Sequence, residues 1–317
     1  MKIGGSKHSD TLVGTIGDDT IIGKAGSDLI ATHGGRDEIS AGSGNDMITG
    51  FAFDMDDIRS SDYLGSRING GKGFDTAIVE LAASAKATLL DAIKGALQIK
   101  SVEEFIFNVS GLSTDKQIVI GTKFGETVNL GDSDAHAMGM EGNDYLYSGG
   151  GDDTLNGGAG QDFLSAGDGH NYVTGGGGRD YFHFGLSSNY QYTEIQDFKN
   201  GKDKIAVSIA VDQFNLIYDA ERETPDPLRG YGDYYYGVGP AINNYVSYNN
   251  GRHFDAETFH ADRGLFDDFI TFDQSTGSIL INHFEEIDDA IYFERVLVAQ
   301  VDTPRALTAD DFVFYVM

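Results

Sequence analysis

A nine-residue unit recurs eleven times in this chain, and it constrains the fold more than any other feature. Each unit carries glycines, then an acid, then an apolar residue two positions later. The first block comprises GSKHSDTLV (5–13), GTIGDDTII (14–22), GKAGSDLIA (23–31), THGGRDEIS (32–40) and AGSGNDMIT (41–49), with an outlying copy, GGKGFDTAI (70–78). The second block comprises GMEGNDYLY (139–147), SGGGDDTLN (148–156), GGAGQDFLS (157–165), AGDGHNYVT (166–174) and GGGGRDYFH (175–183). A unit this short cannot bury a core alone, so its repetition predicts a stack of coils.

The apolar residue of each unit is expected to point into the core of that stack. It is Leu12, Ile21, Ile30, Ile39 or Ile48 in the first block, and Leu146, Leu155, Leu164, Val173 or Phe182 in the second. One inward residue between two outward ones is the pattern of a short strand. The glycines permit the positive φ angles and close backbone approach that tight turns demand. Two units then make one full coil, so equivalent residues of alternate units stack on the same side.

The acids of the units therefore form columns. Asp10, Asp28 and Asp46 share one column, with Asp19 and Asp37 on the opposite side and Asp75 in the outlying copy. In the second block Asp144, Asp162 and Asp180 share one column, with Asp153 and Asn171 opposite. Stacked carboxylates repel one another unless a cation lies between them. Oxygen ligands alone suit a hard cation such as Ca²⁺, whereas zinc would call for Cys or His at set spacing.

These units resemble the RTX, or haemolysin-type, calcium-binding nonapeptide GGxGxDxUx. The resemblance implies a parallel β-roll with Ca²⁺ in the turns on both sides. Thr32 and Ala41 depart from the pattern at the first glycine, and Asn171 departs at the acid, so weaker sites are expected there. Pairs of equivalent units on successive coils give three inter-coil sites in each block, which predicts about six Ca²⁺ ions or more.

The end of the chain carries a second resemblance. TEIQDFKNGKDKIAVS (193–208) is similar to the segment that follows the last calcium repeat in secreted serralysin-type metalloproteases. VLVAQVDTPRALTADDFVFYVM (296–317) resembles the uncleaved C-terminal export signal of the family, although an ordinary final strand is the alternative. The resemblance implies export by the type I secretion machinery of a Gram-negative bacterium, and a secreted, extracellular or cell-surface location. It also accounts for MKIGGSKHSD at the N-terminus, which lacks the apolar core of a classical signal peptide.

Composition excludes several classes of partner. The chain has 22 Lys and Arg against 50 Asp and Glu, a net charge of −28, which disfavours nucleic acid and anionic membrane surfaces. No run of 18 apolar residues is present, so no transmembrane helix is expected. There is no cysteine, so disulfides and thiolate metal sites are absent. With 43 glycines disorder is the alternative to a fold, but 20 Phe and 16 Tyr supply material for a core.

The segments between the arrays have weaker patterns. Residues 50–69 interrupt the first array, and Asp54, Asp56, Asp57 and Asp62 there suit either a further ion or a solvated acidic loop. Residues 82–97 are compatible with a helix or with irregular strands. SVEEFIFNVSG and KQIVIGTKFGETVNLG alternate apolar residues and predict strands of coils without calcium turns. FITFDQSTGSILIN (269–282) predicts a β-hairpin with its turn at residues 275–277.

A tyrosine-rich insertion lies at residues 215–265. Its candidate ligand-binding residues are Tyr231, Tyr234, Tyr235, Tyr236, Tyr245 and Tyr248, with Tyr218 just upstream. Tyrosines among Asn and Gly suit contacts with a polysaccharide or a cell-surface protein, but a long loop packed on the C-terminal domain is the alternative. His253, Asp255 and His260 are a weaker candidate set for a transition metal, with Glu257 and Asp262 nearby. His170 and His183 are expected to be structural.

The sequence thus predicts an all-β chain. We expect a first roll block at 1–78, solenoid or linker strands at 79–131, a second roll block at 132–184, and a capping and secretion domain at 185–317. HExxH, GxSxG and cysteine nucleophiles are all absent, which favours a non-catalytic extracellular matrix, surface or interaction protein that folds on binding Ca²⁺. The alternative is a calcium-dependent enzyme or toxin-like effector with its site in the 215–265 insertion.

Overall fold

The fold was analysed in a computed structural model of the whole chain. It describes residues 1–54, 63, 65–82, 88–89, 97–110, 117–185, 191–209, 247–248, 251–255, 270–273, 276–287, 290–301, 307 and 311–316. Strands dominate these residues, and they contain no α-helix. No helix within these ranges is therefore long and apolar enough to cross a membrane.

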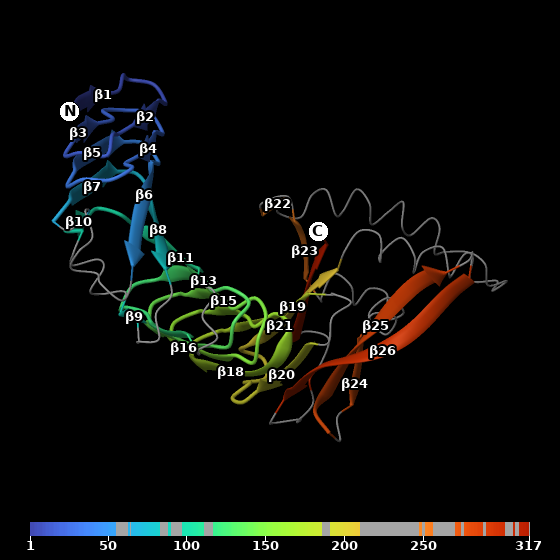
Figure 1. The fold of residues 1–317 in the computed structure, drawn as a ribbon. Coiled ribbons are helices and arrows are strands. Elements are labelled where there is room, and N and C mark those ends of the chain that lie inside the picture. Colours follow the sequence, from blue (N-terminus) through green and yellow to red (C-terminus); the bar gives the residue numbers. More distant parts are fainter. Residues whose placement is uncertain are drawn as a thin grey trace.

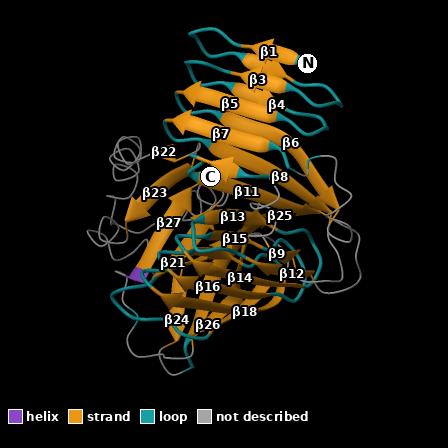
Figure 2. Ribbon diagram, turned by 90° about the vertical axis from the view of Figure 1, so that its left-hand side faces the viewer, coloured by secondary structure: helices purple, strands orange, loops and turns teal. Residues whose placement is uncertain are grey.

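The described strands form three sheets (Figures 1 and 2). The smallest sheet contains, in spatial order, β1 (Lys2–Gly4), β3 (Thr20–Ile22), β5 (Glu38–Ser43), β7 (Arg67–Lys72) and β10 (Ile99–Lys100). The longest contains β2 (Thr11–Val13), β4 (Leu29–Ala31), β6 (Met47–Asp54), β8 (Thr76–Ala82), β11 (Glu104–Ser110), β13 (Glu126–Asn129), β15 (Tyr145–Tyr147), β17 (Phe163–Ser165), β19 (Tyr181–Gly185), β21 (Lys204–Ile209), β27 (Phe312–Val316), β23 (Gly251–Asp255) and β22 (Ser247–Tyr248). The third contains β24 (Ile270–Asp273), β25 (Ser278–Ile287), β26 (Ala290–Val301), β20 (Gln191–Ile195), β18 (Gly169–Gly177), β16 (Thr154–Ala159), β14 (Ala135–Glu141), β12 (Gln117–Ile120) and β9 (Thr88–Leu89).

Each nonapeptide contributes one strand, and alternate units pair in parallel. Leu12 lies opposite Ile30 and Ile30 opposite Ile48, while Leu146 lies opposite Leu164. The two members of each pair come from alternate units, so the structure has the two-unit coil that the repeat predicts. The parallel β-roll expected from the sequence is confirmed.

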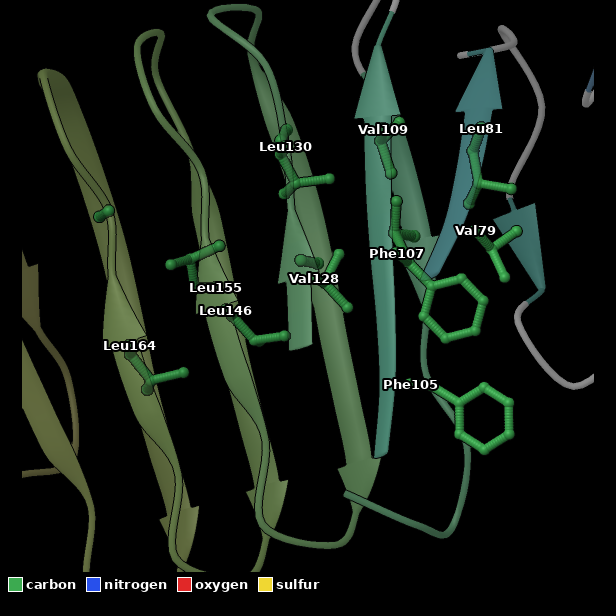
Figure 3. Close-up of a cluster of buried hydrophobic side chains, with 14 of the residues drawn as sticks. Val79, Leu81, Phe105, Phe107, Val109, Val128, Leu130, Leu146, Leu155 and Leu164 are labelled. Atoms are coloured by element: carbon green, nitrogen blue, oxygen red, sulfur yellow. The ribbon is translucent and has the colours of Figure 1, made fainter. Parts of the chain in front are cut away.

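The inward residues of the coils form one continuous hydrophobic core. The apolar residue of every unit is buried, including Ile21, Ile39 and Leu155. Figure 3 shows part of this core, from Val79 and Leu81 through Phe107 and Val128 to Leu164. Because each coil alone exposes its core on both faces, burial depends on the coils above and below it.

The two blocks are joined through the strands between them. The strands expected within 101–131 are confirmed as β11, β12 and β13, and they pair in parallel with their neighbours. The register moves by two residues at β11, since Phe105 faces Ala77 on β8 but Glu126 on β13. The longest sheet nevertheless continues from the first block into the second, so one core passes through both.

The C-terminal strands cover the end of the roll (Figure 1). β26 pairs in parallel with β20, and β27 pairs in parallel with β21, so the last strands add a further layer to the stack. β24 and β25 form the antiparallel hairpin that the sequence predicted at 269–282. The final segment, proposed from the sequence as an export signal, thus contains a strand packed on the roll. The division into four domains stays a prediction.

Candidate metal centre

The acids of the repeat are joined by a ladder of hydrogen bonds from coil to coil. Within a block, the backbone N–H of an acid donates to Oδ1 of the residue at the acid position on the next coil. The N···O distance is 2.8 Å from Asp10 to Asp28, 2.9 Å from Asp19 to Asp37, 2.8 Å from Asp28 to Asp46, 2.9 Å from Asp144 to Asp162, 2.9 Å from Asp153 to Asn171 and 3.1 Å from Asp162 to Asp180. The structure therefore brings the predicted acids together in the predicted columns.

In eight of the described acids the second carboxylate oxygen accepts no hydrogen bond. Within the described residues, Oδ2 is buried without a hydrogen bond in Asp28, Asp37, Asp46, Asp75, Asp144, Asp153, Asp162 and Asp180. A buried anionic oxygen without a donor is costly, and polar groups in native cores are normally satisfied. A row of such oxygens along each column is the arrangement that a row of cation sites requires.

Backbone carbonyls converge on the same points. A Cβ at Gly23 would collide with both the carbonyl oxygen of Ala41 and Oδ2 of Asp28. At Gly139 it would collide with Oδ2 of Asp144 and the carbonyl oxygen of Gly157. The first glycine of the unit therefore leaves room for a cradle of oxygens from two coils.

The donor set decides which ion fits. No group of three His, Cys, Asp or Glu side chains suited to a metal occurs in the described part of the chain, so carbonyl oxygens must complete each site. Carboxylate and carbonyl oxygens in a flexible arrangement match Ca²⁺, and they lack the nitrogen or sulfur that zinc and copper prefer. The residues present therefore fit calcium.

Burial controls the protonation of the columns. Burial raises the pKa of Asp162 to about 6, with the charge of Asp180 adding to the rise and the N–H of Asp144 opposing it. Burial likewise raises the pKa of Asp46 and of Asp180. The pKa of Asp10 lies below its usual value, because the backbone N–H of Ser6 donates to its Oδ2 at 2.5 Å. Asp46, Asp162 and Asp180 thus resist negative charge more than Asp10, the first member of its column, does.

Asn171 shows how a neutral residue fits the same position. Its Oδ1 accepts the N–H of Asp153, as an aspartate would, and its Nδ2 donates to the carbonyl of Gly167 at 3.2 Å. The amide therefore satisfies locally the turn carbonyl that an aspartate leaves free. This supports the expectation of a weaker calcium site on that side of the roll.

The columns also contain residues that sequence reasoning missed. Asp203 accepts the N–H of Asp180 at 3.2 Å and of Lys199 at 2.8 Å, and the Lys199 ammonium reaches the carbonyl of Gly176. Glu126 precedes Asp144 in the ladder, donating its N–H to Oδ1 at 2.9 Å. Residues 121–129 (GTKFGETVN) have the spacing of the nonapeptide, with Glu126 in place of the aspartate. A search for Asp alone does not find this unit.

A second ladder runs along the residue before each acid. The N–H of Asn45 donates to Ser27 Oγ at 3.1 Å, and the N–H of His170 donates to Asp152 Oδ1 at 2.9 Å. Short polar side chains at this position therefore hold the turns together. Polar residues recur before the acid in alternate units, and this recurrence was a sequence signal for the second ladder.

The remaining candidates are placed only in part. The side chains of the tyrosine-rich insertion lie outside the described residues, although the backbones of Tyr248 in β22 and of His253 and Asp255 in β23 are described. Asp56, Asp57 and Asp62 also lie outside them. His183 lies between the hydroxyls of Ser165 and Ser208, at 2.9 and 2.6 Å, and burial lowers its pKa to about 4.

Comparison with known families identifies the repeats. The model of the RTX calcium-binding nonapeptide repeat matches residues 5–39, 13–48, 131–164 and 157–190. The match at 131–164 includes a unit before Gly139 that sequence reasoning did not count, where Ala135 replaces the acid. No curated protein matches the chain. Residues 5–48 and 131–190 of the roll are therefore RTX calcium-binding nonapeptide repeats.

Proposed function

We propose that this chain is a secreted protein that folds on binding calcium outside the cell and acts as a non-catalytic extracellular matrix, surface or interaction protein. The observation that carries the proposal is the set of buried Oδ2 atoms without hydrogen-bond partners along the columns. Bound calcium would supply the positive charge that these oxygens lack. The ligands we propose are Asp10, Asp19, Asp28, Asp37, Asp46, Asp75, Asp144, Asp153, Asp162, Asn171 and Asp180, holding about six ions or more.

The charge of the chain supports coupling between folding and calcium. At −28 the unfolded chain repels itself, and the fold brings acids into register at Asp144, Asp162 and Asp180. Without a counter-charge this register costs free energy. A ligand that binds only the folded state stabilises it, so calcium binding and roll formation are one equilibrium.

Export is the second part of the proposal. RTX repeat proteins are typically secreted by Gram-negative bacteria, and we propose the type I machinery as the partner here. A chain that stays unfolded at low calcium suits passage through a narrow channel. The C-terminal segment, with Asp311 before β27, would serve both as the export signal and as the cap of the roll.

The binding partner we propose is an extracellular polysaccharide or a cell-surface molecule. The support is compositional: the 215–265 insertion concentrates tyrosines, which offer flat apolar area and a hydroxyl at low entropic cost. Replacing Tyr234, Tyr235 and Tyr236 by Ser would remove retention on that partner and leave calcium binding intact. Calcium-dependent turnover of a polysaccharide, peptide or ester would instead favour an enzyme.

The test is far-UV circular dichroism of the full chain during a Ca²⁺ titration, with Mg²⁺ as the control. We expect a cooperative transition from coil to β structure with Ca²⁺ alone, since Mg²⁺ demands a rigid octahedral shell that a turn of carbonyls does not offer. A chain that is fully folded in excess chelator would refute the coupling of folding to calcium.

A further inference from the structure

The first block ends at its outlying nonapeptide (70–78), and the coil beyond it belongs to neither repeat array. Asp75, the acid of the outlying unit, is completely buried, and its Oδ1 accepts the N–H of Asp46 at 2.9 Å. Its Oδ2 is buried and has no hydrogen-bond partner among the described residues. Asp75 therefore presents the same unsatisfied oxygen as the acids inside the columns, in the last nonapeptide of the first block.

The next coil supplies a carboxylate to Asp75 from outside the repeats. β11 follows β8 in the longest sheet, with Glu104 opposite Thr76. Glu103 thus stands above Asp75, and the N–H of Asp75 donates to Oε2 of Glu103 at 2.9 Å. This bond is the ladder bond of the columns, with a glutamate from outside the repeats in place of the aspartate of an equivalent unit.

A backbone carbonyl also lies beside Asp75, as it does beside the acids of the repeat columns. A Cβ at Gly70 would collide with the carbonyl oxygen of Ser101 and would lie 2.5 Å from Oδ2 of Asp75. Gly23 and Gly139 show the same pair of oxygens, one carbonyl from the next coil and one Oδ2 from their own turn. Ser101 reaches this place with φ 50°, a left-handed conformation that is unusual for a residue other than glycine.

We propose that Asp75, Glu103 and the carbonyl of Ser101 form a further site for a hard divalent cation, Ca²⁺, that ties the first repeat block to the strand that follows it. In a nonapeptide the carbonyl and the acid of one unit are five positions apart, as in Ala41 and Asp46. Here Ser101 and Glu103 are two apart, and the extra methylene of Glu brings its carboxylate back to the column. The site rests on the proposed calcium function and extends it to a segment that the family model does not match.

The column of Asp19 and Asp37, on the opposite side of the first block, ends without a second carboxylate. There the N–H of Asp37 donates to Ser66 Oγ at 3.0 Å, so a neutral hydroxyl ends the ladder. Asp75 meets a second carboxylate instead, and that charge joins burial in raising the pKa of Asp75. Glu103 is an exposed residue, so an ion can approach it from solvent.

The test counts Ca²⁺ ions on the folded full-length chain by native mass spectrometry and by calorimetry. Glu103→Gln keeps an oxygen for the N–H of Asp75 but removes the charge, and we expect it to lose one ion and keep the others. Glu104→Gln is the matched control, because the Glu104 carboxylate accepts the Thr76 hydroxyl at 2.8 Å and is not part of the proposed site. This variant should bind as many ions as the wild type. An unchanged count for Glu103→Gln would overturn the proposal.

Two results separate this site from the broader proposal. If the wild-type chain binds no Ca²⁺ and shows no calcium-dependent folding, the proposed function itself is wrong. If it binds Ca²⁺ and folds, but the Glu103 variant binds equally many ions, only the additional site is wrong. Should the variant fail to fold, a crystal structure of the wild-type chain grown with Ca²⁺ decides: ion density beside Asp75 Oδ2 supports the site, and its absence refutes it.

Discussion

Replacing Asp162 by Asn should change stability in opposite directions with and without calcium. Asp162 lies in the middle of its column, between Asp144 and Asp180, and its Oδ2 is buried without a partner. An asparagine keeps Oδ1 for the N–H of Asp144, as Asn171 does for Asp153. Its Nδ2 would donate to the carbonyl of Gly158, the counterpart of the bond from Asn171 to Gly167. The variant therefore preserves the ladder and removes only the charge.

The magnitude follows from the pKa of Asp162. Burial raises it from 3.8 to about 6. A shift of about two units corresponds to about 3 kcal/mol, and solvent screening at the turn reduces this to about 2 kcal/mol. In chelator near pH 7.5 the variant should be more stable than the wild type by that amount. In calcium it should be less stable, since a site held at a hundred times its dissociation constant contributes about 2.7 kcal/mol.

The assay is denaturant unfolding followed by far-UV circular dichroism, in chelator and in millimolar Ca²⁺. Asp152→Asn is the control, because Asp152 is exposed and belongs to the second ladder, where its Oδ1 accepts the N–H of His170. We expect the control to change little under either condition. If Asp162→Asn destabilised the chain equally in chelator and in calcium, the charge of the column would not be what calcium offsets, and the reasoning would fail.

Three further outcomes follow from the same structure. In chelator, the stability that Asp162 contributes, taken as the difference between the wild type and Asp162→Asn, should be greatest below about pH 4 and fall as pH rises through about 6, because folded Asp162 holds its proton to higher pH than the unfolded chain; denaturant midpoints of both proteins at each pH measure this. Gly158→Ala, at φ 106° and against the carbonyl of Met140, should cost at least about 1 kcal/mol in thermal melts, whereas Gly17→Ala meets open space and should not. Leu155→Ala should cost about 2–5 kcal/mol in the same melts, since its side chain is fully buried.

The repeat predicted most of the roll because its chemistry is local. Leu12, Ile30 and Ile48 could be aligned from spacing alone, and the structure pairs them as expected. The columns followed from the same two-unit coil. Asp75 was assigned as a ligand from its unit, although it lies 29 residues from Asp46 because residues 50–69 intervene. A unit carries its own turn, strand and acid, so an insertion between coils leaves its role unchanged.

The contacts where a regular coil meets an irregular one could not be predicted, because one of the two hydrogen-bonded residues lies outside the nonapeptides. Glu103 and Asp203 extend the columns at separations of 28 and 23 residues, and neither belongs to a regular unit. The two-residue register change at β11 has no sequence signal, since both Phe105 and Phe107 are apolar and both are buried. The pairing itself determines that Phe105 lies opposite Ala77 of β8, whereas Phe107 lies opposite Val128 of β13.

Asn171 bears on why the columns are acidic at all. The ladder bond needs one oxygen acceptor, which an amide provides as well as a carboxylate, and the amide also satisfies the turn carbonyl. In a metal-free roll, asparagine would therefore be the better residue wherever Oδ2 is buried without a hydrogen bond. The chain instead has Asp in ten of the eleven units, with the unsatisfied oxygen buried in eight of them. A residue that is costly when metal-free and has a neutral substitute of the same shape makes physical sense only where its charge is compensated. The acids thus support the proposal that the folded roll binds calcium along its columns.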